Sequence, residues 1–329
     1  MATYKGIQGE SVEVLTSDPT PTANHEGKLW YNSTSGDYKI AIDSGGTWSS
    51  ATAVDTNVQA GAGSCGIASA AMYWQGDTPP YTKKAFTYDG SSWTETPAMN
   101  RDSGAYTQGC GTTTAALASA YYRNSPAADL ATCEEWNGSA WSTQNNMNEN
   151  DVGRTGCGTQ TAALCAGGRG IAAPSTPVVN YVESYNGTSW TEEGDITTAR
   201  YAAGMHNGTQ TASLCIGGRI SGSSGLVEEY NGTGWTEVGD LTTARYGSGA
   251  SGTTALALVY GGYTSNTQTE SWNGTSWTEV ADLTTGRGTG GSAGVHNTSA
   301  LMISGGEPYK SQVEEWTSPT YTVKTVTVT

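Results

Sequence analysis

The sequence has little of what several functional classes require. Basic residues are scarce, since 15 Lys and Arg stand against 30 Asp and Glu and the net charge is −15. Nucleic acid is therefore not an expected partner, because phosphate binding depends on basic patches. No stretch approaches the roughly 20 apolar residues of a membrane span, so membrane insertion is not expected. The first ten residues lack a basic start followed by an apolar run, which favours folding in a cytoplasm.

Residues that carry catalytic or metal chemistry are also few. The chain has only three histidines (His25, His206 and His296), which are too few to expect the converging ligands of a copper site. The cysteines form no Cys-x-x-Cys pair, so a zinc site is not expected and the thiols are predicted to be free, buried and small apolar groups. No nucleophile-elbow phrase and no loop with the dense Asp spacing of a calcium site occurs. We expect no cofactor and assign no catalytic or metal-binding residue.

Glycine, tryptophan and tyrosine are abundant instead. The chain has 45 Gly, 11 Trp and 18 Tyr but a single Phe. Each Trp or Tyr can bury roughly 150–250 Å², so these residues can form a core when packed against Gly and Ala. No segment has helical periodicity. The composition therefore favours closely spaced β-strands.

Two phrases repeat along the chain. The first reads Tyr-Asn-Gly-Thr-Ser-Trp-Thr-Glu with small variations, and its second aromatic residue recurs every 42 to 49 residues, at Trp93, Trp141, Trp190, Trp235 and Trp277. The second is an apolar segment that ends in Gly-Gly, as at Gly167-Gly168 and Gly217-Gly218. Asn-Gly between alternating segments indicates a hairpin, with positive φ at both central residues in a type I′ turn. Four short antiparallel strands every 40–50 residues are typical of a propeller blade.

Counting these units predicts an all-β, six-bladed kelch-like propeller. Seven blades is the alternative, because Leu29-Trp30-Tyr31-Asn32 and Thr47-Trp48-Ser49 resemble half a blade. That half could instead close the ring with one strand or form an attachment hairpin. We divide the chain into an N-terminal docking segment with a β-hairpin (1–53) and the propeller (54–329), and assign docking to Leu29, Trp30 and Tyr31.

An Arg and a Glu recur together in the repeat. Both are present in the second to sixth units and both are missing from the first, where Phe86 takes the Glu position. We predict that each Arg forms a partly buried fork with a Glu of its own or the neighbouring blade, as a structural pair. The arginines are Arg101, Arg154, Arg200, Arg245 and Arg287, and the glutamates are Glu134, Glu183, Glu228, Glu270 and Glu314.

The order Gly-Gly, Glu-x-Tyr, Trp and Arg resembles kelch repeats from about residue 54 to 321. The tandem phrases are similar to those of kelch-like virion structural proteins of marine bacteriophages, cyanophages among them. The segment Gly27-Lys28-Leu29-Trp30-Tyr31-Asn32 resembles a phrase common in phage tail and fibre proteins. The resemblance implies a virion protein that is assembled in the host cytoplasm and present in multiple copies per virion.

The expected function is therefore structural. The N-terminal segment would attach to another virion protein of the tail, fibre or capsid, and these locations remain open. The displayed propeller would bind host-surface glycan or neighbouring subunits through its variable loops, where exposed tyrosines could contribute contacts: Tyr81, Tyr122, Tyr263 and Tyr309. The alternative is a glycan-processing enzyme on a propeller scaffold, which requires carboxylates gathered at the channel mouth.

Overall fold

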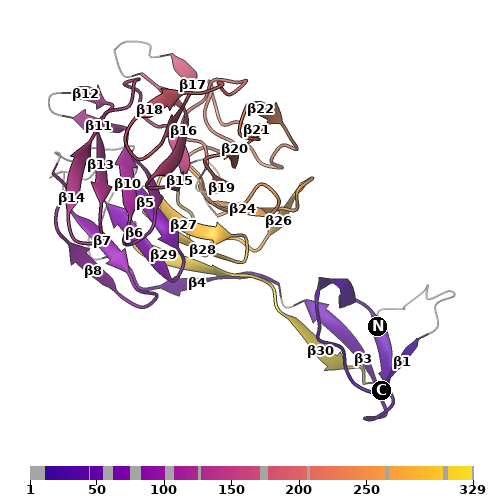
Figure 1. Cartoon of the computed structure of the whole chain (residues 1–329). Coiled ribbons are helices and arrows are strands. Elements are labelled where there is room, and N and C mark those ends of the chain that lie inside the picture. The colour runs from indigo at the N-terminus through magenta and orange to yellow at the C-terminus, as the bar shows by residue number, and fades with distance from the viewer. Residues whose placement is uncertain are drawn as a thin grey trace. The chain divides into compact units, whose positions relative to one another are not determined.

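The computed structural model describes residues 12–43, 45–54, 62–74, 83–100, 107–124, 127–170, 177–205, 208–263, 267–306 and 310–327. Contacts divide the chain into two compact units, which Figure 1 shows. Unit 1 comprises Met1–Gly46 and Ser318–Thr329, and unit 2 comprises Thr47–Thr317. The described residues contain strands, one 3-10 turn (η1, Ala23–His25) and no α-helix. None of their helical segments is long and apolar enough to cross a membrane.

Unit 2 is built from four-stranded antiparallel sheets that follow one another along the chain, six of them within the described residues. Sheet 1 has the order β5-β6-β7-β8, with β5 (Gly63–Ile67), β6 (Ala70–Trp74), β7 (Ala85–Tyr88) and β8 (Trp93–Thr96). Sheet 2 has the order β9-β10-β13-β14, with β9 (Gln108–Gly111), β10 (Ala116–Ser119), β13 (Cys133–Trp136) and β14 (Trp141–Gln144). A separate two-stranded ribbon, β11 (Tyr121–Asn124) and β12 (Ala127–Leu130), is inserted in sheet 2.

The next three sheets repeat the same order. Sheet 3 contains β15 (Thr155–Thr159), β16 (Ala162–Arg169), β17 (Val178–Tyr185) and β18 (Trp190–Glu192). Sheet 4 contains β19 (Gly208–Thr209), β20 (Ala212–Ile216), β21 (Val227–Tyr230) and β22 (Trp235–Glu237). Sheet 5 contains β23 (Gly249–Gly252), β24 (Ala257–Tyr260), β25 (Thr269–Trp272) and β26 (Trp277–Val280).

Sheet 6 combines strands from opposite ends of the sequence. It contains β27 (Gly291–His296), β28 (Ser299–Gly305) and β29 (Lys310–Thr317), and its fourth strand is β4 (Thr47–Ala51). Strand β4 runs antiparallel to β29, with Trp48 opposite Trp316 and Thr47 opposite Thr317. Of the two segments that resemble half a blade, Thr47–Ala51 thus belongs to sheet 6, whereas Leu29–Asn32 belongs to another sheet in unit 1.

The Asn-Gly phrase forms the outer hairpin of sheets 2 to 5, and Asp89-Gly90 forms that of sheet 1, although in a different turn from the one predicted. In the hairpin between β17 and β18 the side-chain Oδ1 of Asn186 accepts the backbone N–H groups of Thr188 and Ser189 at 3.0 and 2.9 Å. Only Gly187 has positive φ there, at 88°. The predicted type I′ turn is therefore wrong, because Asn186 caps a longer loop through its side chain.

Aromatic pairs lie across the outer two strands of every sheet. Tyr185 faces Trp190 with ring centroids 4.9 Å apart, and Tyr230 faces Trp235 at 5.0 Å. Equivalent pairs occur in the other four sheets, at Tyr88–Trp93, Trp136–Trp141, Trp272–Trp277 and Trp48–Trp316. These pairs explain the regular Trp spacing, since cross-strand aromatic contacts stabilise the ladder.

Buried apolar clusters join each sheet to the next. Leu164 of sheet 3 packs in one cluster with Cys215 of sheet 4, and the other clusters join the remaining neighbouring sheets in the same way. One cluster joins Leu301 of sheet 6 to Tyr73 of sheet 1. Polar contacts accompany it, because the Ser64 hydroxyl donates to the Ser292 carbonyl and accepts the Ser292 N–H, both at 2.9 Å.

Unit 1 is a small sheet with the order β1-β2-β3-β30. Its strands are β1 (Glu13–Leu15), β2 (Leu29–Asn32), β3 (Asp37–Asp43) and β30 (Tyr321–Thr325). Trp30, Asn32 and Ala41 are buried on one face, where the Asp18 carboxylate accepts the Trp30 indole N–H at 3.1 Å and the Asn32 amide at 2.8 Å. This hydrogen-bonded loop covers that face.

The observed division differs from the sequence-based boundary after residue 53. The units separate after Gly46, and residues 318–329 belong with the N-terminal unit. Strand pairing is the physical reason: β4 completes sheet 6 through β29, whereas β30 pairs with β3, with Asp43 opposite Tyr321. The chain consequently passes between the units twice.

Candidate functional site

Buried Arg–Glu ion pairs occur in sheets 3 to 6, where four of the five predicted pairs are present. Arg154 Nη1 lies 3.2 Å from Glu183 Oε1. Arg200–Glu228, Arg245–Glu270 and Arg287–Glu314 make the same contact through Nη2 and Oε1. These side chains are at most 2% exposed, so they are fully rather than partly buried. Arg101 lies outside the described residues, and Glu134 accepts the Asn100 N–H at 2.9 Å.

The predicted fork between guanidinium and carboxylate does not form. In sheet 5 one N–H of Arg245 reaches Glu270, while Nη1 donates to the carbonyls of Gln268 and Gly261 at 2.7 and 3.3 Å. The Glu270 carboxylate uses its other oxygen to accept the Thr242 N–H at 2.8 Å. Backbone groups compete for both partners, so each pair fixes the segment that connects one sheet to the next. Burial lowers the pKa of Arg245, and Glu270 opposes that shift.

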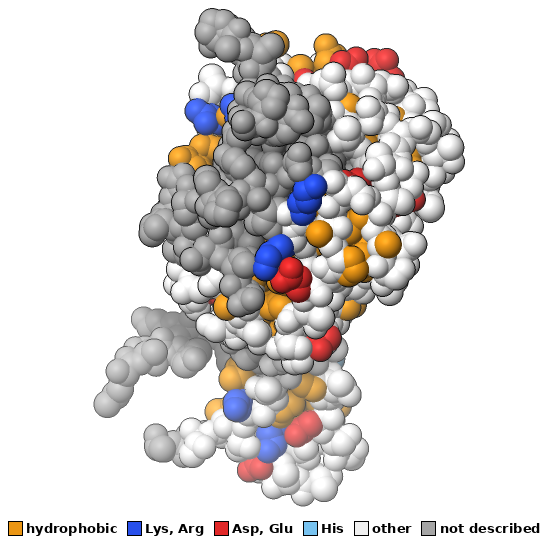
Figure 2. All heavy atoms as spheres, turned by 90° about the vertical axis from the view of Figure 1, so that its left-hand side faces the viewer, with side chains coloured by type: hydrophobic (Ala, Val, Ile, Leu, Met, Phe, Trp, Pro, Cys, Tyr) orange, Lys and Arg blue, Asp and Glu red, His pale blue; other side chains and the backbone are white. Residues whose placement is uncertain are grey.

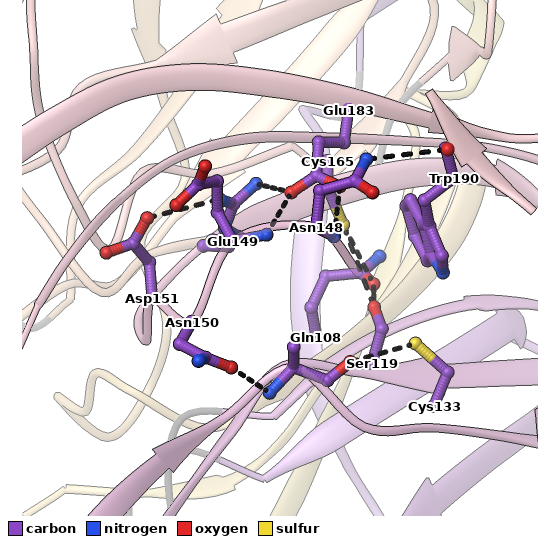
Figure 3. A network of polar contacts seen from close by, with 12 residues as sticks. Gln108, Ser119, Cys133, Asn148, Glu149, Asn150, Asp151, Cys165, Glu183 and Trp190 are labelled. Carbon is purple, nitrogen blue, oxygen red and sulfur yellow. Dashed lines mark hydrogen bonds and ion pairs between the residues drawn. The ribbon is translucent and has the colours of Figure 1, made fainter. Parts of the chain in front are cut away.

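The pair in sheet 3 belongs to a wider polar network, which Figure 3 shows. Arg154 also donates to Asp151 at 3.1 Å, and Glu183 accepts the Asn148 N–H at 2.8 Å. Beneath them Gln108 Oε1 accepts from the Cys165 thiol at 3.3 Å and from the Ser119 hydroxyl (Figure 3). The network links sheets 2 and 3 in the interior.

All six cysteines are free and buried. Three of them occupy equivalent positions on the innermost strands and point to a carbonyl of the next sheet: Cys65 to Thr112, Cys110 to Thr159 and Cys157 to Thr209, at 3.6, 3.5 and 3.3 Å. Burial raises the pKa of the Cys157 thiol to about 12. The described residues contain no group of three or more His, Cys, Asp or Glu that could hold a metal ion.

The innermost strands surround two cavities. The larger, about 230 Å³, is lined by one equivalent glycine from each sheet: Gly66, Gly111, Gly158, Gly208, Gly252 and Gly294. The smaller, about 80 Å³, lies where these strands begin and is lined by Gln108, Arg154, Ala202, Gly247 and Ser248 among others. Gln108 Nε2, Arg154 Nε and Ser248 Oγ have no hydrogen-bond partner among the described residues.

Arginine and tyrosine side chains alternate beside the smaller cavity. The Arg169 guanidinium lies 4.6 Å from the Tyr201 ring centroid, and that of Arg219 lies 6.0 Å from Tyr201 and 5.1 Å from Tyr246. Tyr246 stacks on Tyr263, with centroids 5.0 Å apart and an interplanar angle of 28°. We call these five residues, which lie in or beside sheets 3, 4 and 5, the Arg–Tyr ladder.

Glycine pairs in the repeat position the ladder. Gly217 and Gly218 have φ of 63° and 108°, and Arg219 follows them directly. A Cβ on Gly217 would lie 2.6 Å from the Arg245 carbonyl, so the turn requires glycine. Tyr201 and Arg219 then exchange two backbone hydrogen bonds, of 3.1 and 2.8 Å. Of the ladder residues, only Tyr263 was predicted from the sequence, as a loop contact. The available signal was positional, since Arg169, Arg219 and Tyr263 each follow a Gly-Gly pair and Tyr201 and Tyr246 each follow the repeated Arg.

The structure places the other predicted contact residues in different settings. Tyr81 and Tyr309 lie outside the described residues, and Tyr122 lies in β11, one strand of the inserted ribbon. Tyr263 is 49% exposed. Of the predicted docking residues, Trp30 is buried under the loop that contains Asp18, whereas Leu29 and Tyr31 are partly exposed.

Basic side chains on one face of the molecule can be followed among the described residues. On the face of the molecule shown in Figure 2, the described Lys and Arg side chains are scattered. One basic side chain of unit 2, that of Lys84, forms an ion pair with Glu95 at 2.9 Å.

Comparisons with known proteins identify the fold. No family model matches the chain, and no curated protein matches it in sequence. A solved structure described as "Structure of YjhT" is similar, with a TM-score of 0.66 and 13% identity, over 83% of this chain and 99% of that chain. YjhT is a β-propeller. The chain therefore has a β-propeller fold, and at this identity the likeness extends to the fold alone.

Proposed function

We propose that this chain is a structural protein of a bacteriophage virion, kelch-like in its repeat. Unit 1 docks to a tail, fibre or capsid protein, and the propeller of unit 2 is displayed without a catalytic role of its own. Multiple copies are assembled into the particle in the host cytoplasm. The resemblance of the tandem phrases to marine phage virion proteins motivates this proposal, and the open face of unit 1 carries it.

We further propose that the propeller is a closed ring of six blades, each of the six sheets of unit 2 being one blade. The apolar cluster that joins Leu301 to Tyr73 supports closure, as do the hydrogen bonds between Ser64 and Ser292. The glycine positions support the count, since one equivalent glycine of each sheet lines the same cavity. Strand β4 acts as the closing strand, because it precedes the first sheet of unit 2 in the sequence and pairs with β29 of the last sheet.

The open face of unit 1 is apolar over β1, β2 and β3, whereas Thr322 and Lys324 of β30 lie opposite Ile42 and Ile40 at its edge. Val14 lies opposite Tyr31 and Tyr31 opposite Tyr38, so the three side chains share one side of the sheet. Ile42, two residues beyond Ile40 on the same strand, extends this face. Val14, Tyr38 and Ile42 are 65%, 45% and 38% exposed. Because this unit buries very few side chains, contact with a protein partner would supply apolar burial that its own core lacks.

Two strand connections suit a display role. Thr47 lies opposite Thr317 at the start of β4 and the end of β29, and Asp43 lies opposite Tyr321 in unit 1. In each unit, the two strands that lead into the connecting segments are therefore paired neighbours. A partner that binds unit 1 carries the propeller through two chain segments rather than one.

The test is incorporation of the full chain into particles. Tyr38→Glu places a charge on the open face of unit 1, and Thr236→Glu places one on an exposed position of β22 as the matched control. We expect Tyr38→Glu to be lost from purified particles and Thr236→Glu to be retained, as measured by mass spectrometry and cryo-electron microscopy. Absence of the wild-type chain from particles would overturn the proposal.

A further inference from the structure

We propose that the Arg–Tyr ladder is a binding site for a saccharide that bears an anionic group. The proposal deepens the proposed function, since it rests on the propeller being displayed where a host-surface glycan can reach it. Binding itself depends on this chain alone. It can therefore be measured whether or not the chain is part of a virion.

Arg219 supplies the first argument, from charge. Among the described residues it makes no ion pair, and its guanidinium donates at 3.4 Å to the Tyr246 hydroxyl. The buried arginines of sheets 3 to 6 each contact a glutamate, as in Arg200–Glu228. A half-buried guanidinium without a carboxylate is unusual in a chain with twice as many acidic as basic residues. An anionic ligand would provide the negative counter-charge for the Arg219 guanidinium.

The tyrosines supply the second argument, from shape. Arg219 lies between the rings of Tyr201 and Tyr246, which hold its planar group in place. Tyr246 is only 8% exposed, whereas Tyr263, stacked on it, is 49% exposed. The ladder thus ends in an accessible aromatic face that is held from behind. Such a face suits contact with the apolar side of a sugar ring, since a rigid Tyr adds contact area at little entropic cost.

The adjacent cavity supplies the third argument. Ala202 follows Tyr201 and Gly247 follows Tyr246, and both residues line the cavity of about 80 Å³. The Ser248 hydroxyl and the Gln108 amide nitrogen in its lining have no partner among the described residues. Buried polar atoms generally have hydrogen-bond partners, so these two would be satisfied by hydroxyl groups of a ligand or by water. Charge, aromatic surface and polar groups therefore converge on one side of the propeller.

The experiment measures binding to the purified full-length protein by isothermal titration calorimetry. The probes are an oligogalacturonate with carboxylate groups, a sulfated galactan oligosaccharide, and a neutral maltooligosaccharide of equal length. We expect one or both anionic probes to bind more tightly than the neutral one. Binding of both identifies negative charge as the shared feature, and binding of one identifies the group that the site selects.

Variants locate the site. Arg219→Gln should weaken binding by about tenfold to a hundredfold, the range for losing a charged hydrogen bond. Tyr263→Ala should weaken it by about fivefold, in line with the roughly 1 kcal/mol of an aromatic contact. Lys84→Gln, a basic residue paired with Glu95 in sheet 1, is the matched control and should not change binding. Circular dichroism establishes that each variant is folded.

Three results would overturn the proposal: no binding of any probe, equal binding of the neutral probe, or undiminished binding by a folded Arg219→Gln variant. A chain that binds anionic saccharide but is absent from particles would contradict the docking role alone. Conversely, a chain present in particles that binds none of the three probes would contradict the saccharide site alone.

Discussion

Arg200 and Glu228, 28 residues apart in the sequence, contact each other where each residue is 1% exposed. Glu228 also accepts the N–H groups of Thr197 and Thr198 at 2.7 and 3.2 Å. Those threonines belong to the segment that arrives from sheet 3. The ion pair therefore joins a strand of sheet 4 to the connection that precedes it, and the contact recurs in the neighbouring sheets.

Glu228→Gln should destabilise the protein strongly. The substitution leaves the buried Arg200 guanidinium without a counter-charge, which typically costs about 3–5 kcal/mol in the free energy of unfolding. Urea denaturation measures the loss. Glu237→Gln is the control, because Glu237 is exposed and lies directly opposite Glu228, and its effect should stay within about 0.5 kcal/mol. Equal effects of the two variants would show that burial of the pair does not matter.

The cysteines should be inert in the folded protein. Burial raises the pKa of Cys215 to about 11 and that of Cys165 to about 12. At pH 8 the fraction of Cys215 thiolate should be roughly a hundredfold below that of an ordinary cysteine, since each pKa unit is a factor of ten. Alkylation by iodoacetamide, followed by mass spectrometry, should be slow in buffer and complete in urea. Rapid native labelling would contradict the burial described for these thiols.

The same raised pKa values set a pH dependence. A thiol whose pKa is higher in the folded state favours folding while it is protonated. The contribution of Cys215 is therefore complete below about pH 9 and is lost as the pH rises towards 11. Urea midpoints measured between pH 8 and pH 11 should fall, and they should fall less in Cys215→Ala. A midpoint that rises over this range would contradict the sign of the effect.

Strand β4 should be essential to the propeller. Trp48 is buried, its ring lies 4.8 Å from that of Tyr260, and its indole N–H donates to the Thr269 hydroxyl at 2.9 Å. Trp48→Ala should reduce the free energy of unfolding by about 3–5 kcal/mol.

Two fragments of unit 2 separate the role of β4 from that of unit 1. A fragment of residues 47–317 keeps β4 and should unfold cooperatively, whereas a fragment of residues 54–317 lacks it and exposes the edge of β29. Thermal melts and size-exclusion chromatography compare them. Equal stability of both fragments would refute a closing role for β4.

Asp18 should make the covered face of unit 1 sensitive to acid. Hydrogen bonds from Asn32 and then Trp30 hold the pKa of this exposed carboxyl below its usual value. The lowered pKa means that its stabilising effect is present above about pH 4 and is lost as the pH falls through the folded-state pKa. The NMR signal of the Trp30 indole N–H should shift below pH 4 in the wild type and stay constant in Asp18→Asn. Identical titrations would contradict the assigned contact.

Local repeats made much of the fold predictable. Trp93, Trp141 and Trp190 each begin the outermost strand of a sheet, so their spacing marked one strand in every unit. The co-occurrence of Arg and Glu predicted the ion pairs, because a buried charge requires a partner. The sequence did not predict how many backbone groups bond to each Arg and Glu side chain, and this is why the expected fork was wrong. The backbone carbonyls that accept from the arginines belong to residues of any type, so no pattern of side chains predicts them.

Pairings between distant segments were only partly visible in the sequence, where Thr47-Trp48-Ser49 resembles half a blade but does not indicate its partner strand. Strand β4 pairs with β29, more than 250 residues later, and β30 pairs with β3. Strand β30 contains no part of the repeated phrase, and an edge strand of a few residues has no distinctive pattern of its own. The inserted ribbon β11–β12 likewise lies where Gly-Gly was expected, so the repeat gave no indication of it.

The placement of β3 and β30 has a consequence for how this protein can be altered. They are antiparallel neighbours in unit 1, and the whole of unit 2 lies between them in the sequence. The propeller is thus an insertion into a hairpin of a smaller host domain. Any domain whose first and last strands emerge side by side could occupy the same position, which makes unit 1 a host domain into which other domains can be inserted.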